Sequence, residues 1–241
     1  MIQIDGVSKV YGKDFLAVDN LTLEIRDGEI FGFLGPNGAG KTTTLKMMTG
    51  VATITKGNIY LNHKSIVTED IEAKRQFGFV PDNPDVLLRL TGLEYLNFIA
   101  SIYGIEKSVK DERIKSLATR FELTEALTDR IQNYSHGMRQ KILVIGVLLH
   151  DPAIWILDEP LTGLDPKSSF ILKEMMREHA RSGKTVFFST HVLEVAEKIC
   201  DRVGIINKGK LIFVGTVAEL KAQQQENSSL ESLFLELTGN E

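Results

Sequence analysis

The chain has 241 residues, of which 43% are hydrophobic and 25% are charged, and its formal net charge is −4. This length suits one large domain, or one core with an inserted subdomain, and the composition is that of a globular protein. The negative charge argues against nucleic acid as the main partner, because binding to phosphate backbones requires a concentrated basic face. A single cysteine, Cys200, excludes an internal disulfide framework and fits a reducing compartment.

Nothing in the sequence predicts a membrane-spanning segment. Met1 leads directly into the strand-like run 2–4, so no signal peptide is expected. The longest apolar runs, such as 142–149, are far shorter than the roughly 20 residues that a bilayer requires. We therefore expect a soluble chain, and any membrane part of its assembly must come from another chain.

Short apolar runs separated by glycine turns predict strands in both halves of the chain. The run 30–34 is apolar almost throughout, which is typical of a strand buried on both faces of a parallel sheet. A glycine-rich loop follows it, and then a helix is predicted over 43–48. The other predicted strands cover 21–25, 57–61, 154–157, 186–189, 203–206 and 211–214, with a hairpin turn over 207–210.

From about 83 to 149 the hydrophobic spacing becomes helical. Apolar positions recur at three- and four-residue intervals, as at Leu93, Leu96 and Ala100. The end of the chain carries an amphipathic stripe, with Ser228 and Glu231 fitting a capping box before it. The stripe is Leu230, Leu233, Phe234 and Leu237. It predicts a terminal helix that docks on its own domain or binds a partner. The layout is an α/β core whose two halves flank a helical insertion.

The segment after the buried strand matches the phosphate-binding pattern G-x-x-x-x-G-K-[ST]. Its residues are Gly35, Pro36, Asn37, Gly38, Ala39, Gly40, Lys41 and Thr42. The glycines let backbone N–H groups converge on phosphate oxygens. Lys41 then reaches the β- and γ-phosphates, and the Thr42 hydroxyl is placed to ligate Mg²⁺. Because the pattern lies between a strand and a helix, it indicates a nucleotide site rather than an incidental turn.

A second apolar strand, 154–157, ends in two carboxylates, Asp158 and Glu159. A strand beside the phosphate-loop strand would bring Asp158 to the Mg²⁺ shell and Glu159 to the attacking water. Acidic pairs at strand ends are common, so this signal gains its meaning from the phosphate loop upstream. Together the two motifs predict a nucleoside triphosphatase.

The remaining motifs, in this order, resemble the ATP-binding cassette (ABC) family over essentially the whole chain. Tyr11 matches the aromatic that stacks on adenine in that family. The segment 134–140, Tyr-Ser-His-Gly-Met-Arg-Gln, matches the signature sequence Leu-Ser-Gly-Gly-Gln at Ser135 and Gly137 and departs from it at 134, 136 and 138. Asp165 matches the loop that communicates between the two nucleotide sites, and His191 matches the switch histidine that contacts the γ-phosphate.

The resemblance implies an α/β fold: a P-loop NTPase (RecA-like) core with an N-terminal antiparallel β-subdomain and an inserted α-helical subdomain. It divides the chain into a nucleotide-binding core over 1–81 and 150–215, a helical insertion over 82–149 and a C-terminal helical tail over 216–241. It also implies ATP and Mg²⁺ as cofactors, with the phosphate loop and Thr43 holding the phosphates. Ser135 and Gly137 would reach the ATP of a second cassette.

One departure from the family lies after the strand that ends at Pro81. The family places there a glutamine that ligates Mg²⁺ and links the nucleotide to the membrane subunit, whereas this chain has Asp82. Aspartate is shorter and charged. Two hypotheses are open: Asp82 meets the metal directly or through water, or it only caps the helical insertion.

The resemblance further implies transmembrane permease subunits as partners, a second cassette in a homo- or heterodimer, and a location at the cytoplasmic face of the cell membrane. The segments 90–96 and 233–237 resemble bacterial exporters whose ATPase and membrane subunits are separate chains. Two alternatives remain: a weakly active regulatory cassette in a heterodimer, and a non-transport ABC ATPase. The transported substrate has no signature in this chain.

Overall fold

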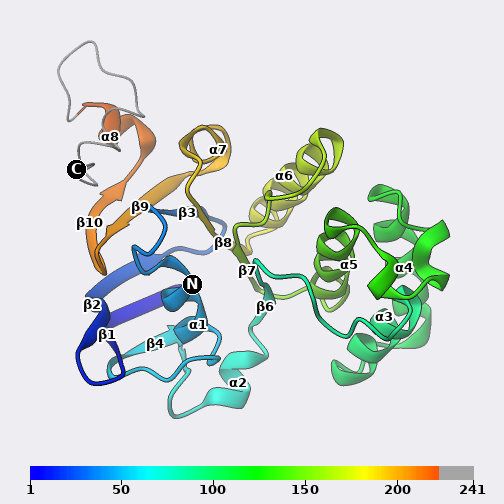
Figure 1. The fold of residues 1–241 in the computed structure, drawn as a ribbon, viewed down its shortest axis with the longest axis horizontal. Coiled ribbons are helices and arrows are strands. Elements are labelled where there is room, and N and C mark those ends of the chain that lie inside the picture. Colours follow the sequence, from blue (N-terminus) through cyan, green and yellow to red (C-terminus); the bar gives the residue numbers. More distant parts are fainter. Residues whose placement is uncertain (223–241) are drawn as a thin grey trace.

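The structure, a computed structural model, describes residues 1–222 and contains two sheets (Figure 1). The smaller sheet has four antiparallel strands in the order β2-β1-β4-β5, and the larger has six in the order β10-β9-β3-β8-β7-β6. The strands of the smaller sheet are β1 (Ile2–Tyr11), β2 (Phe15–Ile25), β4 (Lys56–Leu61) and β5 (Lys64–Ser65). Those of the larger are β3 (Ile30–Leu34), β6 (Phe77–Val80), β7 (Ile154–Asp158), β8 (Thr185–Thr190), β9 (Arg202–Asn207) and β10 (Lys210–Gly215).

The centre of the larger sheet is parallel and buried. Every residue of β3, β7 and β8 is buried, as expected for apolar strands covered on both faces. These strands pair in parallel, with Leu34 opposite Thr190 and Asp158 opposite Ser189. Their carboxyl ends therefore meet at one edge of the sheet, where ligands bind in open α/β sheets.

Two groups of helices surround the sheets. Figure 1 shows α3, α4 and α5 gathered at one end of the molecule, beyond β6 and away from the smaller sheet. They are α3 (Gly92–Ile102), α4 (Lys107–Arg120) and α5 (His136–Leu149), joined by short 3-10 turns at Glu125–Thr128 and Ile131–Asn133. The other helices are α1 (Lys41–Met48), α2 (Asp70–Lys74), α6 (Pro166–Arg181), α7 (Leu193–Ile199) and α8 (Val217–Ala222).

Alternation along the central strands divides the core into layers. Phe31, Ile156 and Phe187 belong to the apolar cluster between the two sheets, which also includes residues of α1. Their strand neighbours Trp155 and Phe188 belong to a second cluster that continues into α5 and α6. Successive residues of a strand point to opposite faces of the sheet. The larger sheet therefore packs against the phosphate-loop helix with one face and against the inserted helices with the other.

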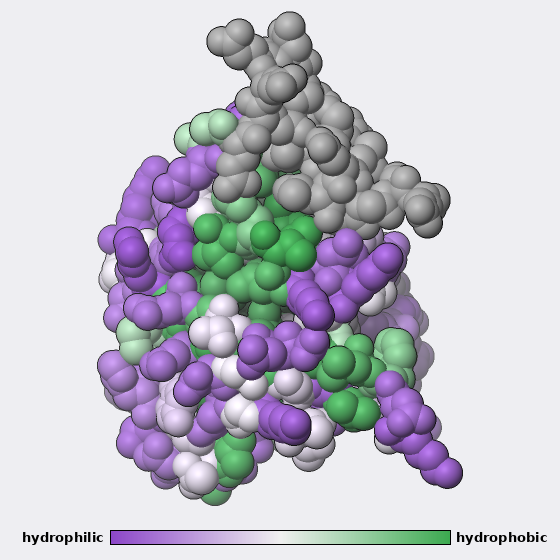
Figure 2. Space-filling view, turned by 90° about the vertical axis from the view of Figure 1, so that its left-hand side faces the viewer, coloured by the Kyte–Doolittle hydropathy of each residue, from purple (hydrophilic) through white to green (hydrophobic). Residues whose placement is uncertain are grey.

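Hydrophobic side chains remain exposed at both ends of the molecule. Figure 2 views the end where β2 and β10 lie: hydrophilic residues cover most of it, and hydrophobic ones gather in its middle. At the other end, α3 exposes Phe98 and Ile102.

Over residues 1–222, none of the helices combines the length and apolar character that crossing a bilayer demands.

The predicted strands are confirmed, and the run 30–34 forms β3 without change. The helix predicted over 43–48 begins earlier, at Lys41, because Gly40 (φ 113°) is its N-terminal cap and ends the loop there. The 16-residue helix α6 has no counterpart among the predictions above. The predicted amphipathic helix around Leu230–Leu237 lies outside the described residues.

Candidate functional site

The phosphate loop joins β3 to α1 and is held from both sides. A Cβ atom at Gly35 would lie 2.4 Å from the Ile206 carbonyl oxygen, and one at Gly40 would lie 2.8 Å from that of Ala17. Only glycine fits so close to neighbouring backbone. The Gly209 N–H also donates to the Ala39 carbonyl at 2.9 Å. The loop is therefore locked between β9 and the β1–β2 hairpin, and Thr42 and Thr43 form the first turn of α1.

Lys41 is the buried cation of this loop, with 6% of its surface exposed. Its Nζ donates to the Gly35 carbonyl at 2.7 Å and to the Pro36 carbonyl at 3.3 Å. The same atom lies 3.5 Å from Glu159 Oε1. The ammonium group is thus held between the loop that precedes it and the acidic end of β7.

Asp158, the last residue of β7, is 2% exposed and bound by two hydroxyl groups. Ser189 Oγ donates to Asp158 Oδ1 at 2.6 Å, and the Thr42 hydroxyl also bonds the carboxylate. Burial raises the pKa of Asp158, and the charges of Asp82 and Glu159 raise it further. A carboxylate destabilised by burial and by like charges favours a nearby cation.

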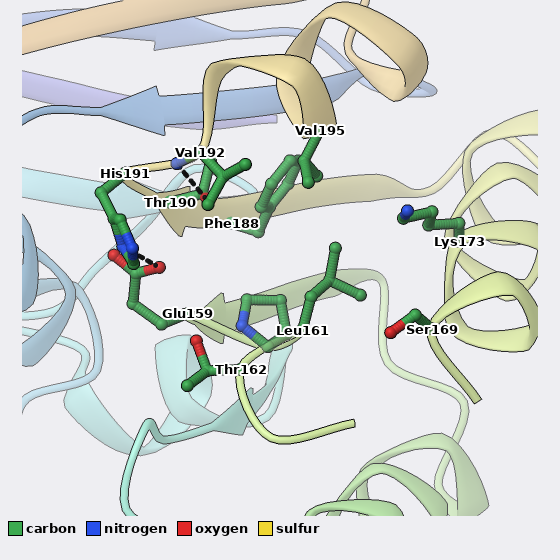
Figure 3. A pocket seen from close by; sticks show the side chains of 11 residues that line it. Glu159, Leu161, Thr162, Ser169, Lys173, Phe188, Thr190, His191, Val192 and Val195 are labelled. Atoms are coloured by element: carbon green, nitrogen blue, oxygen red, sulfur yellow. Dashed lines mark hydrogen bonds and ion pairs between the residues drawn. The ribbon is translucent and has the colours of Figure 1, made fainter. Parts of the chain in front are cut away.

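Glu159 lies at the turn that leaves β7, with a left-handed backbone (φ 46°) that non-glycine residues seldom adopt. Its N–H donates to Ser189 Oγ at 3.0 Å, so one serine hydroxyl fixes both acidic residues. Glu159 Oε2 lies 3.0 Å from His191 Nδ1. Figure 3 shows this pair at one end of a cavity of about 350 Å³, with Ser169 and Lys173 of α6 projecting into it from the far side.

The oxygen donors at this edge fit Mg²⁺. Among the residues that the structure describes, no three acidic, histidine or cysteine side chains gather closely enough to hold a metal by themselves. Mg²⁺ differs from most metals in this respect, because it is usually held by one or two carboxylates together with substrate phosphates and water. Asp158 and the Thr42 hydroxyl offer such a partial set beside the phosphate loop.

Asp82 is exposed in the segment after β6, within electrostatic reach of Asp158. The hypothesis that Asp82 caps the helical insertion is wrong. Thr91 is the N-cap of α3, and its hydroxyl accepts from the Glu94 N–H while Glu94 accepts from the Thr91 N–H. That reciprocal box satisfies the helix start without Asp82.

The signature segment starts α5. Ser135 is its N-cap, and its Oγ accepts from the Met138 N–H at 3.3 Å. Gly137 packs so closely on the loop after β7 that a Cβ there would lie 3.0 Å from the Gly163 carbonyl oxygen. Tyr134, a departure from the family sequence, is buried and donates to the Ala126 carbonyl at 2.5 Å. Tyr134 thus has a structural reason to differ from the family sequence, because its side chain anchors the helical insertion.

Asp165 is the N-cap of α6. Its carboxylate accepts from the N–H and the hydroxyl of Ser168 at 2.9 and 2.5 Å, and it pairs with Lys141 of α5 at 3.3 Å. The bonds from Ser168, followed by the charge of Lys141, hold the pKa of Asp165 far below its usual range. Lys141 therefore ties the signature helix to the loop that starts at Glu159.

The structure gathers the predicted residues into two groups. Lys41, Thr42, Asp158, Glu159 and His191 meet at the carboxyl edge of the larger sheet, while Ser135, Gly137 and Asp165 lie together at the starts of α5 and α6. Tyr11 stands apart at the end of β1, with 38% of its surface exposed.

Sequence reasoning missed two residues of these groups, Ser189 and Lys141. Ser189 is inconspicuous in the sequence because it lies within an apolar strand. A polar residue near the end of a buried strand was its only signal.

Comparisons with known proteins agree with this geometry. Residues 18–162 match the family model described as ABC transporter. The chain is 36% identical over 220 residues to the linearmycin resistance ATP-binding protein LnrL of Bacillus subtilis, covering 91% of this chain and 70% of that protein. It is 35% identical over 220 residues to the Nod factor export ATP-binding protein I of Cupriavidus metallidurans, covering 91% and 72%.

A solved structure described as the ATP-binding subunit of an ABC transporter superposes with a TM-score of 0.93 at 31% identity and covers 99% of both chains. The α/β fold with a P-loop NTPase core is thereby confirmed. On the family model, the relatives and the shared fold together, this chain belongs to the ABC transporter family, among its ATP-binding subunits.

Proposed function

We propose that this chain hydrolyses Mg·ATP and that the reaction drives export through separate membrane subunits. The observation that carries the proposal is the convergence of Lys41, Thr42, Asp158, Glu159 and His191 beneath a glycine loop whose neighbours admit no side chain at Gly35 or Gly40. Such an arrangement combines phosphate binding, metal ligands and a general base in one place.

In this mechanism the N–H groups of the phosphate loop and the Lys41 ammonium bind the β- and γ-phosphates. Thr42 and Asp158 would hold Mg²⁺, which supplies charge neutralisation on the phosphate oxygens. Glu159 accepts a proton from the attacking water, whose oxygen bonds the γ-phosphorus while the bond to ADP breaks. His191, bound to Glu159 at 3.0 Å, orients that carboxylate and contacts the γ-phosphate. Ser189 fixes the backbone of Glu159 and the carboxylate of Asp158.

Ser135 and Gly137 complete the site of a second cassette. They lie at the N-terminus of α5, where free N–H groups and the helix dipole favour anions. The loop 159–165 connects Glu159 to Asp165, and Asp165 pairs with Lys141 of α5. A structural change at Glu159 on hydrolysis is therefore transmitted to α5, whose start serves the second site. A dimer that closes on two ATP molecules and opens after hydrolysis follows from this arrangement.

Transport rests on membership in the family and on two relatives whose names refer to resistance and export. Membrane subunits would dock on the helical insertion, where α3 exposes Phe98 (48%) and Ile102 (60%). A cytoplasmic location at the membrane follows from such docking.

Pairing with a second, more active cassette is the alternative, but this chain retains the residues of an active site, which are Lys41, Asp158, Glu159 and His191.

The proposal is tested by measuring phosphate release from ATP. The chain should be purified alone and together with the multi-span membrane protein encoded nearest to it. We expect Mg²⁺-dependent hydrolysis that the membrane protein stimulates in vesicles. Co-purification without any hydrolysis would contradict the enzymatic half of the proposal, and hydrolysis that no membrane protein affects would contradict the transport half.

We also propose that Asp82 contributes to Mg²⁺ binding. Its charge raises the pKa of Asp158, so it acts on the carboxylate that would hold the metal, and the capping role belongs to Thr91. In Asp82→Asn, assayed with the partner, the Mg²⁺ concentration for half-maximal hydrolysis should rise about fivefold, as expected for ~1 kcal/mol from a charge near the surface. Asp111→Asn, which removes an exposed charge on α4, is the matched control. An unchanged Mg²⁺ dependence in Asp82→Asn would rule out the role.

A further inference from the structure

Lys9 is a buried lysine with no role in the mechanism above. It lies on β1, two residues before Tyr11, and only 7% of its surface is exposed. In the described part of the chain it has no ion pair with a carboxylate. Burying an ammonium group without an opposite charge is costly, so the groups that surround it indicate what it does.

Three groups surround the Lys9 ammonium. Its Nζ lies 2.6 Å from the Thr53 carbonyl oxygen and 3.1 Å from Thr53 Oγ1, and it stands 4.9 Å from the centre of the Tyr11 ring, over one face. Two acceptors and an aromatic face replace the water that the cation loses. The contact covers one face of the Tyr11 ring and fixes its plane.

Thr53 connects this contact to the phosphate loop. It lies in the segment that follows α1, where the Ala52 N–H donates to the Lys46 carbonyl of that helix at 2.9 Å. Thr55, two residues on, returns to β1: its N–H donates to the Ser8 carbonyl, and its Oγ1 accepts from the Val10 N–H. The Tyr11 ring is therefore positioned relative to α1, the helix that the phosphate loop begins.

We infer that Lys9 is a positioning residue for nucleobase binding: it holds the Tyr11 ring in place for a purine to stack on the ring face that Lys9 leaves free. This inference rests on the proposed ATP site and on stacking of the base on Tyr11, which the family resemblance implies. A ring that is already fixed loses less conformational entropy when the base stacks, and a cation behind the ring draws its electron density away from the stacking face. Lys9 thus strengthens binding of the nucleobase and does not affect binding of the phosphates.

The test compares a ligand that has a base with one that lacks it. ATP and inorganic tripolyphosphate are titrated calorimetrically, with Mg²⁺, into the full chain and into Lys9→Met. We expect ATP to bind about three- to tenfold more weakly to the variant, which is the effect of a partly desolvated cation–π contact. Tripolyphosphate should bind equally to both proteins. Lys56→Met, which removes an exposed lysine from the same sheet, should bind ATP as the unmodified chain does.

A merely structural lysine would give a different pattern. In that case Lys9→Met would weaken ATP and tripolyphosphate alike, and the inference would be wrong. A double-mutant cycle sharpens the distinction, since adding Lys9→Met to Tyr11→Ala should change ATP affinity less than twofold. Lys9→Arg, which keeps a cation behind the ring, should recover part of the lost affinity.

The failure of this inference is separable from failure of the proposed function. If Tyr11→Ala bound ATP normally, stacking on Tyr11 and the role of Lys9 would both be excluded, while hydrolysis at Glu159 would stand. If the unmodified chain bound tripolyphosphate but showed no preference for ATP, the inference would again fail. If it bound neither ligand, the proposed function itself would fall.

Discussion

Replacing Glu159 by glutamine should remove nearly all turnover while leaving ATP binding intact. The amide keeps the size of the side chain but cannot accept the proton of the attacking water, and general-base catalysis is typically worth 10²–10⁴-fold. We therefore expect hydrolysis to fall about 10³-fold. The substitution leaves the backbone bond to Ser189 unchanged, so the strained turn at this position should survive.

The same variant reports on assembly. If two cassettes close around ATP and open only after hydrolysis, Glu159→Gln should accumulate as a dimer when ATP is added. Phosphate release measures the first expectation, and size-exclusion chromatography with and without ATP measures the second. Glu194→Gln, an exposed carboxylate of α7, is the matched control and should behave as the unmodified chain in both assays.

Two outcomes would contradict this account of Glu159. Hydrolysis at the unmodified rate would exclude it as the base and favour the alternative of a weakly active cassette whose partner supplies turnover. Loss of both turnover and ATP binding, with normal thermal unfolding, would show that its contacts with Lys41 and His191 serve nucleotide binding instead.

The phosphate loop and the acidic strand end could be predicted because their chemistry is local in the sequence. Residues 35–42 are contiguous, and Asp158 and Glu159 follow directly from a strand whose apolar run is unbroken. Ser189 could not be found in this way. Its role depends on the register of β7 and β8, which places it opposite Asp158, and register between distant strands is a tertiary property.

The helix α6 differs from Ser189, because the signals that predict it are local in the sequence. Its start carries a readable signal, since Asp165 is the N-cap and Pro166 occupies the first helical turn. The resemblance of Asp165 to the family loop gives it a role in that loop and does not by itself indicate the helix that it begins. Its buried residues Leu172, Met175, Met176 and His179 have the three–four spacing that would have predicted it.

The sequence alone leaves two roles open for Asp82. The sequence shows a carboxylate where the family has an amide, and both capping and metal binding are ordinary roles for aspartate. The structure decides against capping, because Thr91 and Glu94 already close the start of α3. The remaining role, Mg²⁺ binding, is the one that the Asp82→Asn measurement tests.

Replacing Lys41 by methionine should remove most of the affinity for ATP. The ammonium lies among the Gly35 and Pro36 carbonyls and Glu159, positioned to exchange these partners for phosphate oxygens. Hydrogen bonds to charged groups contribute about 1.5–3 kcal/mol, so the Kd for ATP should rise roughly 10- to 150-fold. Hydrolysis should be lost as well, because the same cation stabilises the transferring γ-phosphoryl group.

Lys46→Met is the control for this prediction, since Lys46 is an exposed residue at the other end of α1. Calorimetric titration of ATP measures affinity, and thermal unfolding tests whether the loop survives loss of the Lys41 bonds to Gly35 and Pro36. A Lys41→Met variant that folds normally and binds ATP with unchanged affinity would show that the glycine loop alone holds the phosphates.

Because Lys41 also neutralises Glu159 at 3.5 Å, its removal should leave that carboxylate facing phosphate without a cation between them. The effect on ATP should therefore exceed the effect on ADP, whose phosphates end before the γ-position.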